Sequence, residues 1–300
     1  MKNTLFLIIP LLLAGFTVGC RQIDRIVLAQ PATATPAITP TFAPTPAPTA
    51  IVPAPTPTPT TIIPDTGWMQ IQPNLERRII NVVDTTGKQI EQIYLLRINP
   101  TAYQFSIAYH PTEPKTLPDW QAETGALIVV NGGYFREEDG KYIPTGLTIV
   151  NGQTIGRSYD TFAGMLAIAN SGPELRWLEQ EPVDPGEPLV AGLQSFPILV
   201  KPGGQLGFPE QYEDNKKARR TVIAQDKDGR MLFIVTAKGY FTLHQLSKYL
   251  VDSDLELDMA LNLDGGKSSG ILLNDPFETI PALSLLPIVI TIESNEVEIK

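Results

Sequence analysis

The sequence predicts an α/β (α+β) fold, with a single globular domain built on a mixed, largely antiparallel sheet with few helices, after a disordered Pro/Thr-rich stalk. Short apolar segments of strand type recur from about residue 91 onward, whereas only one segment has a well-marked helix start. Between two of these segments, residues 226–229 (Asp-Lys-Asp-Gly) have the composition of a hairpin turn. Before residue 65, proline and threonine replace the apolar pattern, which separates the stalk from the domain.

Residues 1–20 are typical of an export signal. Lys2 precedes a short apolar run that ends at Gly19 and Cys20. This run is shorter than a membrane-spanning helix, which needs about 20 apolar residues. Its ending resembles a bacterial lipobox, with Thr17 where leucine is usual. We therefore expect an exported protein that is lipid-anchored through Cys20 at the cell membrane and faces outside the cytoplasm. An ordinary signal peptide is the alternative.

Residues 21–64 form the predicted linker. Between residues 29 and 64 there are 11 prolines, 10 threonines and no charged side chain. Such a composition cannot build a packed core, and proline favours the extended polyproline II conformation. At about 3.1 Å per residue this stretch could reach on the order of 100 Å. We expect it to hold the following domain away from the membrane.

Residues 65–300 have the length of one domain, and their charge restricts its partners. Three of the 23 basic and one of the 32 acidic residues precede this part, which leaves 20 basic against 31 acidic groups. An acidic domain is a poor general binder of nucleic acid, because phosphate contacts dominate that affinity. Cys20 is the only cysteine, so the domain has no disulfide, no cysteine nucleophile and no thiolate metal site.

The secondary structure follows from local patterns along the domain. Thr242 can cap a helix and Gln245 completes a capping box, while leucines recur on one face up to Leu250. A shorter helix is expected at residues 118–124, and residues 186–193 are ambiguous. The expected strands are residues 91–99, 103–110, 126–130, 165–170, 220–226, 231–237, 257–264 and 286–293.

Two expected strands end in a polar residue followed by two glycines, namely Asn131, Gly132 and Gly133 in one and Asp264, Gly265 and Gly266 in the other. Paired glycines permit positive φ and close approach to the backbone, so that successive N–H groups can form a concave anion site. The alternative is a pair of tight turns in which the polar side chains satisfy local N–H groups.

Alternation along residues 257–264 assigns their side chains to two faces. The apolar face contains Leu257, Met259, Leu261 and Leu263, and the other face contains Asp258, Ala260, Asn262 and Asp264. Asn262 and Asp264 are therefore expected to share a face.

The Gly-Lys-Ser at residues 266–268 does not indicate a nucleotide-binding loop. That motif needs a glycine five residues before Gly266, where Leu261 stands, so no nucleotide cofactor is expected. His110 and His244 are the only histidines and are too few for a histidine-based metal centre; each is expected to be structural or solvated.

A calcium site made of oxygen ligands is a further alternative, with Asp264, Asn262 and Asn131 as its candidate ligands. Lys216, Lys217, Arg219 and Arg220 form a basic cluster. The lysines are expected to be solvated, whereas Arg220 opens an expected strand and could be held rigidly for bidentate recognition of a phosphate.

Four motifs in order resemble the phosphodiester glycosidase family, and the resemblance extends from about residue 79 to the C-terminus. The family includes an animal enzyme that removes N-acetylglucosamine from a phosphodiester. The matching motifs are residues 130–135 (VNGGYF), 194–200 (QSFPILV), 220–224 (RTVIA) and 260–266 (ALNLDGG). The chain departs from the family pattern at Lys267, which replaces a third glycine, and at Gln245, where the family helix often carries glutamate.

The resemblance implies an exported hydrolase that cleaves the glycosidic bond of a sugar 1-phosphodiester or a cell-envelope glycan. Asp264, Asn131 and Asn262 would be the catalytic residues, and the phosphate would be bound by Gly132, Gly133, Arg220, Thr221, Gly265, Gly266 and Ser268. No cofactor is expected beyond a possible divalent cation. Because of the two departures, the alternative is a non-catalytic lipoprotein of the same fold that binds glycans or cell wall, and a calcium-dependent module is the third hypothesis.

Overall fold

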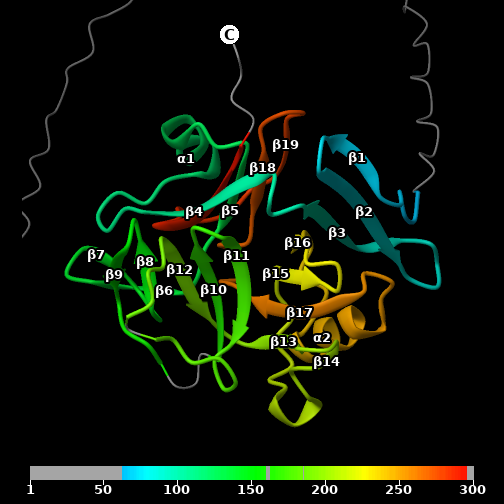
Figure 1. Cartoon of the computed structure of the whole chain (residues 1–300). Helices are drawn as coiled ribbons and strands as arrows, with labels where there is room; N and C mark the ends of the chain where they lie inside the picture. Colours follow the sequence, from blue (N-terminus) through cyan, green and yellow to red (C-terminus); the bar gives the residue numbers. More distant parts are fainter. Residues whose placement is uncertain (1–62, 160–162, 185, 296–300) are drawn as a thin grey trace, which may run out of the picture. The chain divides into compact units, whose positions relative to one another are not determined.

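Antiparallel strands make up most of the described part of the chain, which comprises residues 63–159, 163–184 and 186–295 of the computed structural model (Figure 1). Cys20, the export signal and nearly all of the predicted linker lie outside these residues. Within them, every strand pair is antiparallel, and there is no parallel pair. The predicted fold class, largely antiparallel with few helices, is confirmed. No described helix has both the length and the apolar character needed to cross a membrane.

The strands form three larger sheets and one hairpin among the described residues. The eight-stranded sheet has the order β1 (Met69–Gln72), β2 (Leu75–Val83), β3 (Gln89–Ile98), β16 (Met231–Thr236), β15 (Thr221–Asp226), β17 (Leu257–Asn262), β13 (Ile198–Lys201) and β14 (Gln205–Leu206). One five-stranded sheet has the order β11 (Gly172–Trp177), β10 (Gly164–Ala169), β12 (Ala191–Ser195), β8 (Thr148–Val150) and β9 (Gln153–Ile155).

The other five-stranded sheet has the order β19 (Glu278–Ile280), β18 (Ile271–Leu273), β5 (Ile128–Asn131), β20 (Ile288–Ser294) and β4 (Tyr103–Tyr109), and the hairpin joins β6 (Phe135–Glu138) to β7 (Lys141–Pro144). The described helices are α1 (Leu117–Thr124), α2 (Leu243–Asp252) and the short 3-10 helix η1 (Glu210–Tyr212).

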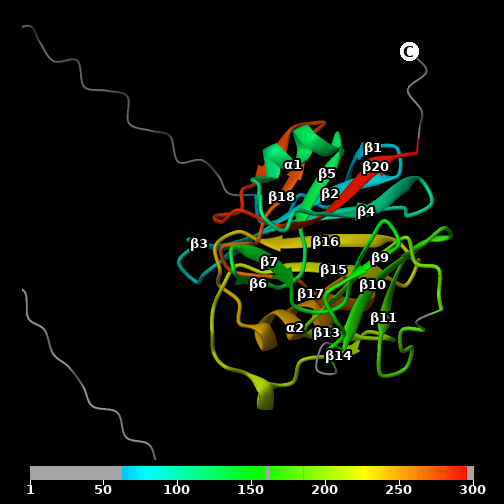
Figure 2. The same ribbon diagram turned by 90° about the vertical axis from the view of Figure 1, so that its left-hand side faces the viewer.

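The main core lies between the three sheets. In Figure 2 the sheet that contains β4 and β20 lies above β15, β16 and β17, and the buried side chains of both sheets meet between them. Phe105 of β4 stacks on Phe233 of β16 with ring centroids 6.4 Å apart. The third sheet adds residues such as Leu166 and Leu193 to the same core.

Each of the two α-helices covers the outer face of one sheet (Figure 1). The helix α1 packs Leu117 and Trp120 against β5 and β18. The helix α2 buries Leu246 and Leu250 against the face of the eight-stranded sheet that faces away from the main core. Its predicted capping box is present, because Thr242 accepts a hydrogen bond from the N–H of Gln245 and the Gln245 side chain accepts one from Thr242.

The expected alternation along β17 is wrong at its first residue. Met259, Leu261 and Leu263 lie in the main core, but Leu257 packs with the α2 side of the sheet. The pairing between β15 and β17 shifts between Gln225 and Asp226, so a bulge reverses the face of the strand's first residue. Sequence alternation cannot locate such an inserted residue.

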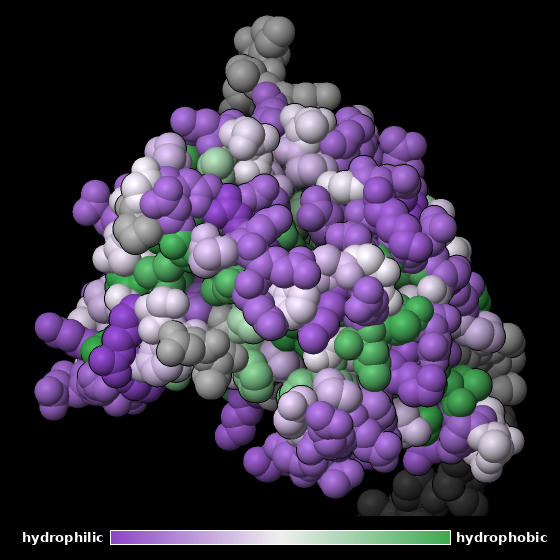
Figure 3. Space-filling model, turned by 60° about the horizontal axis from the view of Figure 1, so that its bottom comes forward, coloured by the Kyte–Doolittle hydropathy of each residue, from purple (hydrophilic) through white to green (hydrophobic). Residues whose placement is uncertain are grey.

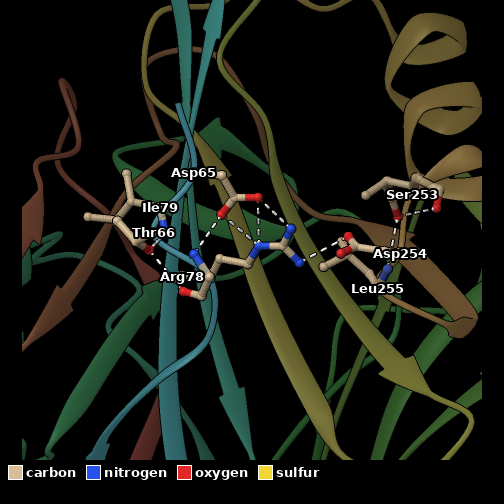
Figure 4. Close-up of polar contacts among 9 residues, drawn as sticks. Asp65, Thr66, Arg78, Ile79, Ser253, Asp254 and Leu255 are labelled. Carbon is tan, nitrogen blue, oxygen red and sulfur yellow. Dashed lines mark hydrogen bonds and ion pairs between the residues drawn. The ribbon is translucent and has the colours of Figure 1, made fainter. Parts of the chain in front are cut away.

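A buried arginine joins the beginning of the described chain to the end of α2. Arg78 of β2 donates a hydrogen bond from Nε to the Asp65 carboxylate at 2.9 Å and one from Nη1 to Asp254 at 2.9 Å (Figure 4). Its side chain is 9% exposed, and its guanidinium also lies near the ring of Trp68. The arginine therefore stabilises the edge of the large sheet.

The surface seen from the side of α2 and β14 is mostly hydrophilic, and hydrophobic residues appear on it in small groups (Figure 3). This face has no broad apolar area that would by itself indicate a docking surface.

Candidate active site

The two strand ends with paired glycines meet where the three sheets converge. Asn131 ends β5 and Asn262 ends β17, and these strands belong to different sheets. The two ends are bonded directly, because the N–H of Asp264 donates to the carbonyl of Gly132 at 3.2 Å. The third sheet reaches the same place through Ser195 at the end of β12, whose hydroxyl donates to the carbonyl of Asn262 at 2.7 Å.

Asn131 is the centre of this junction. Its Nδ2 donates to the carbonyl oxygen of Asp264 at 2.8 Å, and its Oδ1 accepts from the Thr221 hydroxyl at 2.7 Å and from the N–H of Gly270 at 3.0 Å. The side chain is fully buried. Asn131 and Thr221 therefore fix the backbone that carries Asp264, rather than facing a ligand.

Asp264 is half-buried and lies just beyond the end of β17. Its Oδ1 accepts the N–H of Gly265 at 2.8 Å. Burial raises the pKa of the Asp264 carboxyl above its ordinary value, while hydrogen bonds from the Ser268 hydroxyl and the Gly265 N–H oppose that shift. A carboxylate held in one orientation, with a raised pKa, is suited to act as a base or as a stabiliser of a forming cation.

Tyr134 is a candidate site residue that sequence reasoning missed. Its hydroxyl donates to the carbonyl of Phe196 at 3.0 Å and accepts from Nδ2 of Asn262 at 2.8 Å. Burial raises the pKa of Tyr134 well above its usual range, and the negative charge of Asp264 raises it further, whereas Arg220 lowers it. The phenol therefore stays protonated. Its position directly after the first glycine pair could have indicated it.

Asn262 is fully buried and links Tyr134 to the segment after β12. Its Nδ2 also donates to the carbonyl of Phe196 at 3.0 Å, and its Oδ1 is buried without a hydrogen-bond partner among the described residues. Asn262 thus holds Tyr134 and Phe196 together.

Arg220 is a buried cation that forms no ion pair with a carboxylate among the described residues. Its side chain is 8% exposed, one Nη donates to the carbonyl of Lys216 at 2.6 Å, and its Nε has no hydrogen-bond partner within the described residues. Burial lowers the pKa of Arg220, and the nearby acidic groups, Tyr134 first, oppose this shift. The guanidinium remains charged, so an anion beside it would offset the cost of its burial.

The predicted nest of glycine N–H groups is largely wrong. The N–H of Gly132 donates to Ile288 and that of Gly266 to Arg219, while that of Gly265 is bonded to the Asp264 carboxylate. Of the four glycines only Gly266 has positive φ, at 64°.

The other three glycines allow close packing instead. A Cβ on Gly132 would lie 2.7 Å from Ile288 Cγ2, one on Gly133 3.2 Å from Leu193 Cδ1, and one on Gly265 3.1 Å from the Arg219 carbonyl. Gly133 remains the candidate backbone donor for a ligand.

The two departures from the family pattern lie in different surroundings. Gln245 is engaged in the cap of α2. Lys267 is exposed in the turn after Asp264, and its carbonyl accepts the N–H of Leu283. The histidines lie in other contacts, His110 beside Glu123 and His244 against the carbonyl of Phe208.

The geometry does not favour the calcium hypothesis. Oδ1 of Asn131 already accepts two hydrogen bonds, which leaves no free ligand oxygen on that side chain. The described residues contain no group of three or more His, Cys, Asp or Glu side chains that could hold a metal ion.

A cavity of about 760 Å³ lies elsewhere, beside β8, β9 and β12, where Ile149, Tyr159, Leu189 and Gln194 are among its lining residues. We place the chemistry at the strand-end junction instead, because the half-buried carboxylate and the buried unpaired cation are there.

The sequence matches known proteins over this same region. A model of the phosphodiester glycosidase family matches residues 124–285, which is more than half of the chain. The chain is 24% identical to mouse and 22% identical to bovine N-acetylglucosamine-1-phosphodiester alpha-N-acetylglucosaminidase, over 187 residues in each case. These matches cover 56% of this chain and 35% of each relative, so the chain spans about a third of the length of these curated relatives.

The fold is also similar to solved structures. The catalytic domain of zebrafish N-acetylglucosamine-1-phosphodiester alpha-N-acetylglucosaminidase, auto-inhibited by its pro-peptide, aligns with a TM-score of 0.60 and 19% identity, covering 75% of this chain and 85% of that chain. A hypothetical protein from Synechocystis aligns with a TM-score of 0.50 and 13% identity, covering 75% of this chain and 63% of that one. These similarities establish a shared fold.

Proposed function

The chain belongs to the phosphodiester glycosidase family, and we propose that its domain hydrolyses the glycosidic C–O bond of a sugar 1-phosphodiester. One observation carries this proposal. At a single strand-end junction, a Cβ on Gly265, directly after Asp264, would lie 3.9 Å from Nη1 of Arg220. The half-buried carboxylate and the buried guanidinium, which forms no ion pair among the described residues, therefore flank one turn. A glycosyl phosphate presents one developing positive charge and one negative charge, which these two groups complement.

The reaction would break the bond between the anomeric carbon and the bridging oxygen. The sugar passes through an oxocarbenium-like transition state, and water then supplies the new hydroxyl while the phosphate leaves as a monoester. We assign Asp264 to the cationic sugar and its incoming water. We assign Arg220, the N–H of Gly133 and the Ser268 hydroxyl to the leaving phosphate, whose growing charge preorganised donors stabilise. A phosphate monoester is a good leaving group, so a separate general acid is less necessary.

The side chains of Asn131, Thr221 and Asn262 would position these groups. Asn131 fixes the backbone carbonyl of Asp264, Thr221 fixes Asn131, and Asn262 holds Tyr134 against Phe196. Because all three are buried, their effect on the reaction would come through the positions of Asp264 and Tyr134.

Export and lipid anchoring are part of the proposal. The signal-like residues 1–20, Cys20 at their end and the Pro/Thr-rich residues 21–64 support a domain held outside the cytoplasm at a membrane. Labelling with radioactive palmitate, compared between the full chain and its Cys20→Ala variant, tests this part. Equal labelling of the two would contradict anchoring through Cys20.

Sugar release tests the reaction itself. An aryl phosphodiester of N-acetylglucosamine 1-phosphate is supplied to the wild type and to Asp264→Asn, with Asp258→Asn at the other end of β17 as the matched control. We expect Asp264→Asn to lower kcat at least about 100-fold, as the loss of one transition-state partner typically does, and the control to keep its rate. If the wild type releases sugar and Asp264→Asn does so at the same rate, Asp264 takes no part in the chemistry. Binding of the substrate without turnover by the wild type would favour the glycan-binding alternative.

A further inference from the structure

The arginines beside the candidate active site differ from most others in the described chain. Six arginines elsewhere pair with carboxylates, namely Arg77, Arg78, Arg97, Arg136, Arg176 and Arg230. Arg157 lies over the ring of Tyr159. Arg219 and Arg220 have no carboxylate within ion-pair distance among the described residues, and the Nε of each is buried without a hydrogen-bond partner there. Two adjacent cations thus lack an ion pair among the described residues, although Asp214 and Glu213 act on Arg220, and Glu91 acts on Arg219, at longer range.

Three lysines extend this pair across the surface. Lys216 is joined to Arg220 through its carbonyl, and Lys217 follows it. Lys267 is next to the same pair in space, because the N–H of its neighbour Gly266 donates to the carbonyl of Arg219 at 2.8 Å. We call residues Lys216, Lys217, Arg219, Arg220 and Lys267 the basic strip.

The lysines of the basic strip are exposed and weakly neutralised. Nζ of Lys217 lies 4.5 Å from the ring centroid of Tyr240, a contact that leaves its charge in place. Lys216 pairs with Asp214, but both side chains are exposed, at 81% and 47%, so water and salt screen the pair. Lys267 forms no ion pair with a described residue. The domain has 20 basic and 31 acidic groups and is therefore acidic as a whole. The basic strip is a local excess of positive charge on it.

A single glycosyl phosphodiester carries one negative charge, and the one positive charge of Arg220 is enough to balance it. Such a substrate would supply no negative charge for the remaining cations of the basic strip. A substrate whose leaving group continues into further phosphodiesters would place additional charges along the strip, and each neutralised charge would raise both affinity and association rate in a salt-dependent way.

We propose that the basic strip binds the continuing chain of a polymeric substrate, in which the scissile sugar 1-phosphodiester is followed by further phosphodiesters. This inference rests on the proposed function and specifies its substrate class. The bonds that break and form are the same as in the proposed reaction. The anomeric C–O bond breaks, water gives the hydroxyl to the sugar and a proton to the phosphate, and the polymer leaves with a terminal phosphomonoester.

Two synthetic substrates of different length test the proposal. One carries N-acetylglucosamine 1-phosphate esterified to glycerol, and the other carries it esterified to an oligo(glycerol phosphate) with three more phosphodiesters. We expect kcat/KM for the long substrate to exceed that for the short one about tenfold at 0.02 M salt. The ratio should approach one near 0.5 M salt, where the screening length falls to a few ångströms.

Charge removal shows which residues carry the difference. In Lys216→Gln/Lys217→Gln/Lys267→Gln the ratio of the two kcat/KM values should fall to about two or less at 0.02 M salt, with the melting temperature measured to confirm folding. Lys227→Gln is the matched control, because Lys227 is an exposed lysine in the hairpin at the opposite end of β15 from Arg220. It should keep the full ratio.

The outcomes separate this inference from the proposed function. Sugar release from both substrates with a ratio near one at every salt concentration would overturn the inference and leave the reaction intact. No release from either, together with salt-dependent binding of the oligo(glycerol phosphate) to the wild type, would overturn the reaction and support the basic strip. If neither sugar release nor salt-dependent binding is seen, both the reaction and the inference are overturned. Equal competition at every salt concentration by an oligonucleotide with the same number of phosphates would overturn the inference alone.

Discussion

Replacing Asn131 with alanine removes the side chain that joins the strand ends at the candidate site. Its principal partners lose their hydrogen bonds, namely the buried Thr221 hydroxyl, the buried Gly270 N–H and the partly buried Asp264 carbonyl. A buried polar group left unpaired costs about 1–3 kcal/mol. Because the three share one site and their costs are not additive, we expect the free energy of unfolding to fall by about 3–5 kcal/mol. In a domain of this size that lowers Tm by on the order of 10 °C.

Urea and thermal unfolding of the domain measure this change, with Thr221→Val as the comparison. That variant removes one of the three bonds and is expected to cost about 1 kcal/mol. Sugar release at 25 °C, where both variants are still folded, should fall more for Asn131→Ala because the backbone of Asp264 is no longer fixed. A loss of stability below 1 kcal/mol for Asn131→Ala, or one equal to that of Thr221→Val, would refute the view that Asn131 holds the junction together.

Three further changes have defined outcomes. Burial raises the pKa of Asp264, so this carboxyl favours the folded state at low pH and disfavours it as pH rises through its folded pKa; Asp264→Asn should therefore raise Tm at pH 7, and calorimetry should show the gain shrinking toward pH 4. Gly132→Ala places a Cβ 2.7 Å from Ile288 Cγ2 and should lower the free energy of unfolding by about 1–3 kcal/mol in urea titrations. Arg78→Met removes the link to Asp65 and should cost about 1 kcal/mol, with faster hydrogen exchange at residues 65–72; unchanged exchange would contradict that link.

The strands and the capped helix could be predicted because their causes are local. Runs of β-branched and aliphatic residues predicted β4, β5, β15, β16 and β20 within a few residues of their observed bounds. The capping box at Thr242 and Gln245 depends on side chains three residues apart, which a sequence displays directly. Both kinds of pattern specify local structure without reference to residues elsewhere in the chain.

The site could be predicted only in part, because the packing around its glycines depends on residues that are distant in the sequence. Asn131 and Asp264 were predicted from strand-end motifs and Arg220 from its place at the start of a strand, and the structure places all three around one junction. The expected nest failed because the space available to Gly132 and Gly265 is set by Ile288 and Arg219, residues that their own sequence surroundings do not reveal. Tyr134 was missed for the same reason, since its partners are Asn262 in β17 and Phe196 in the segment between β12 and β13.

The junction concentrates groups that weaken the folded state in the absence of a ligand. Burial raises the pKa of the Asp264 carboxyl, and the guanidinium of Arg220 is buried and forms no ion pair with a carboxylate among the described residues. A core built only for stability would pair these charges or replace them with apolar side chains. Asn131 instead fixes the backbone of Asp264 and the side chain of Thr221, which follows Arg220. The unpaired guanidinium costs stability but can meet an opposite charge. A ligand that supplies an anion to Arg220 would bind only the folded domain and raise its Tm by mass action. The unpaired state of Arg220 is therefore an argument for anion binding that does not depend on resemblance to any other protein.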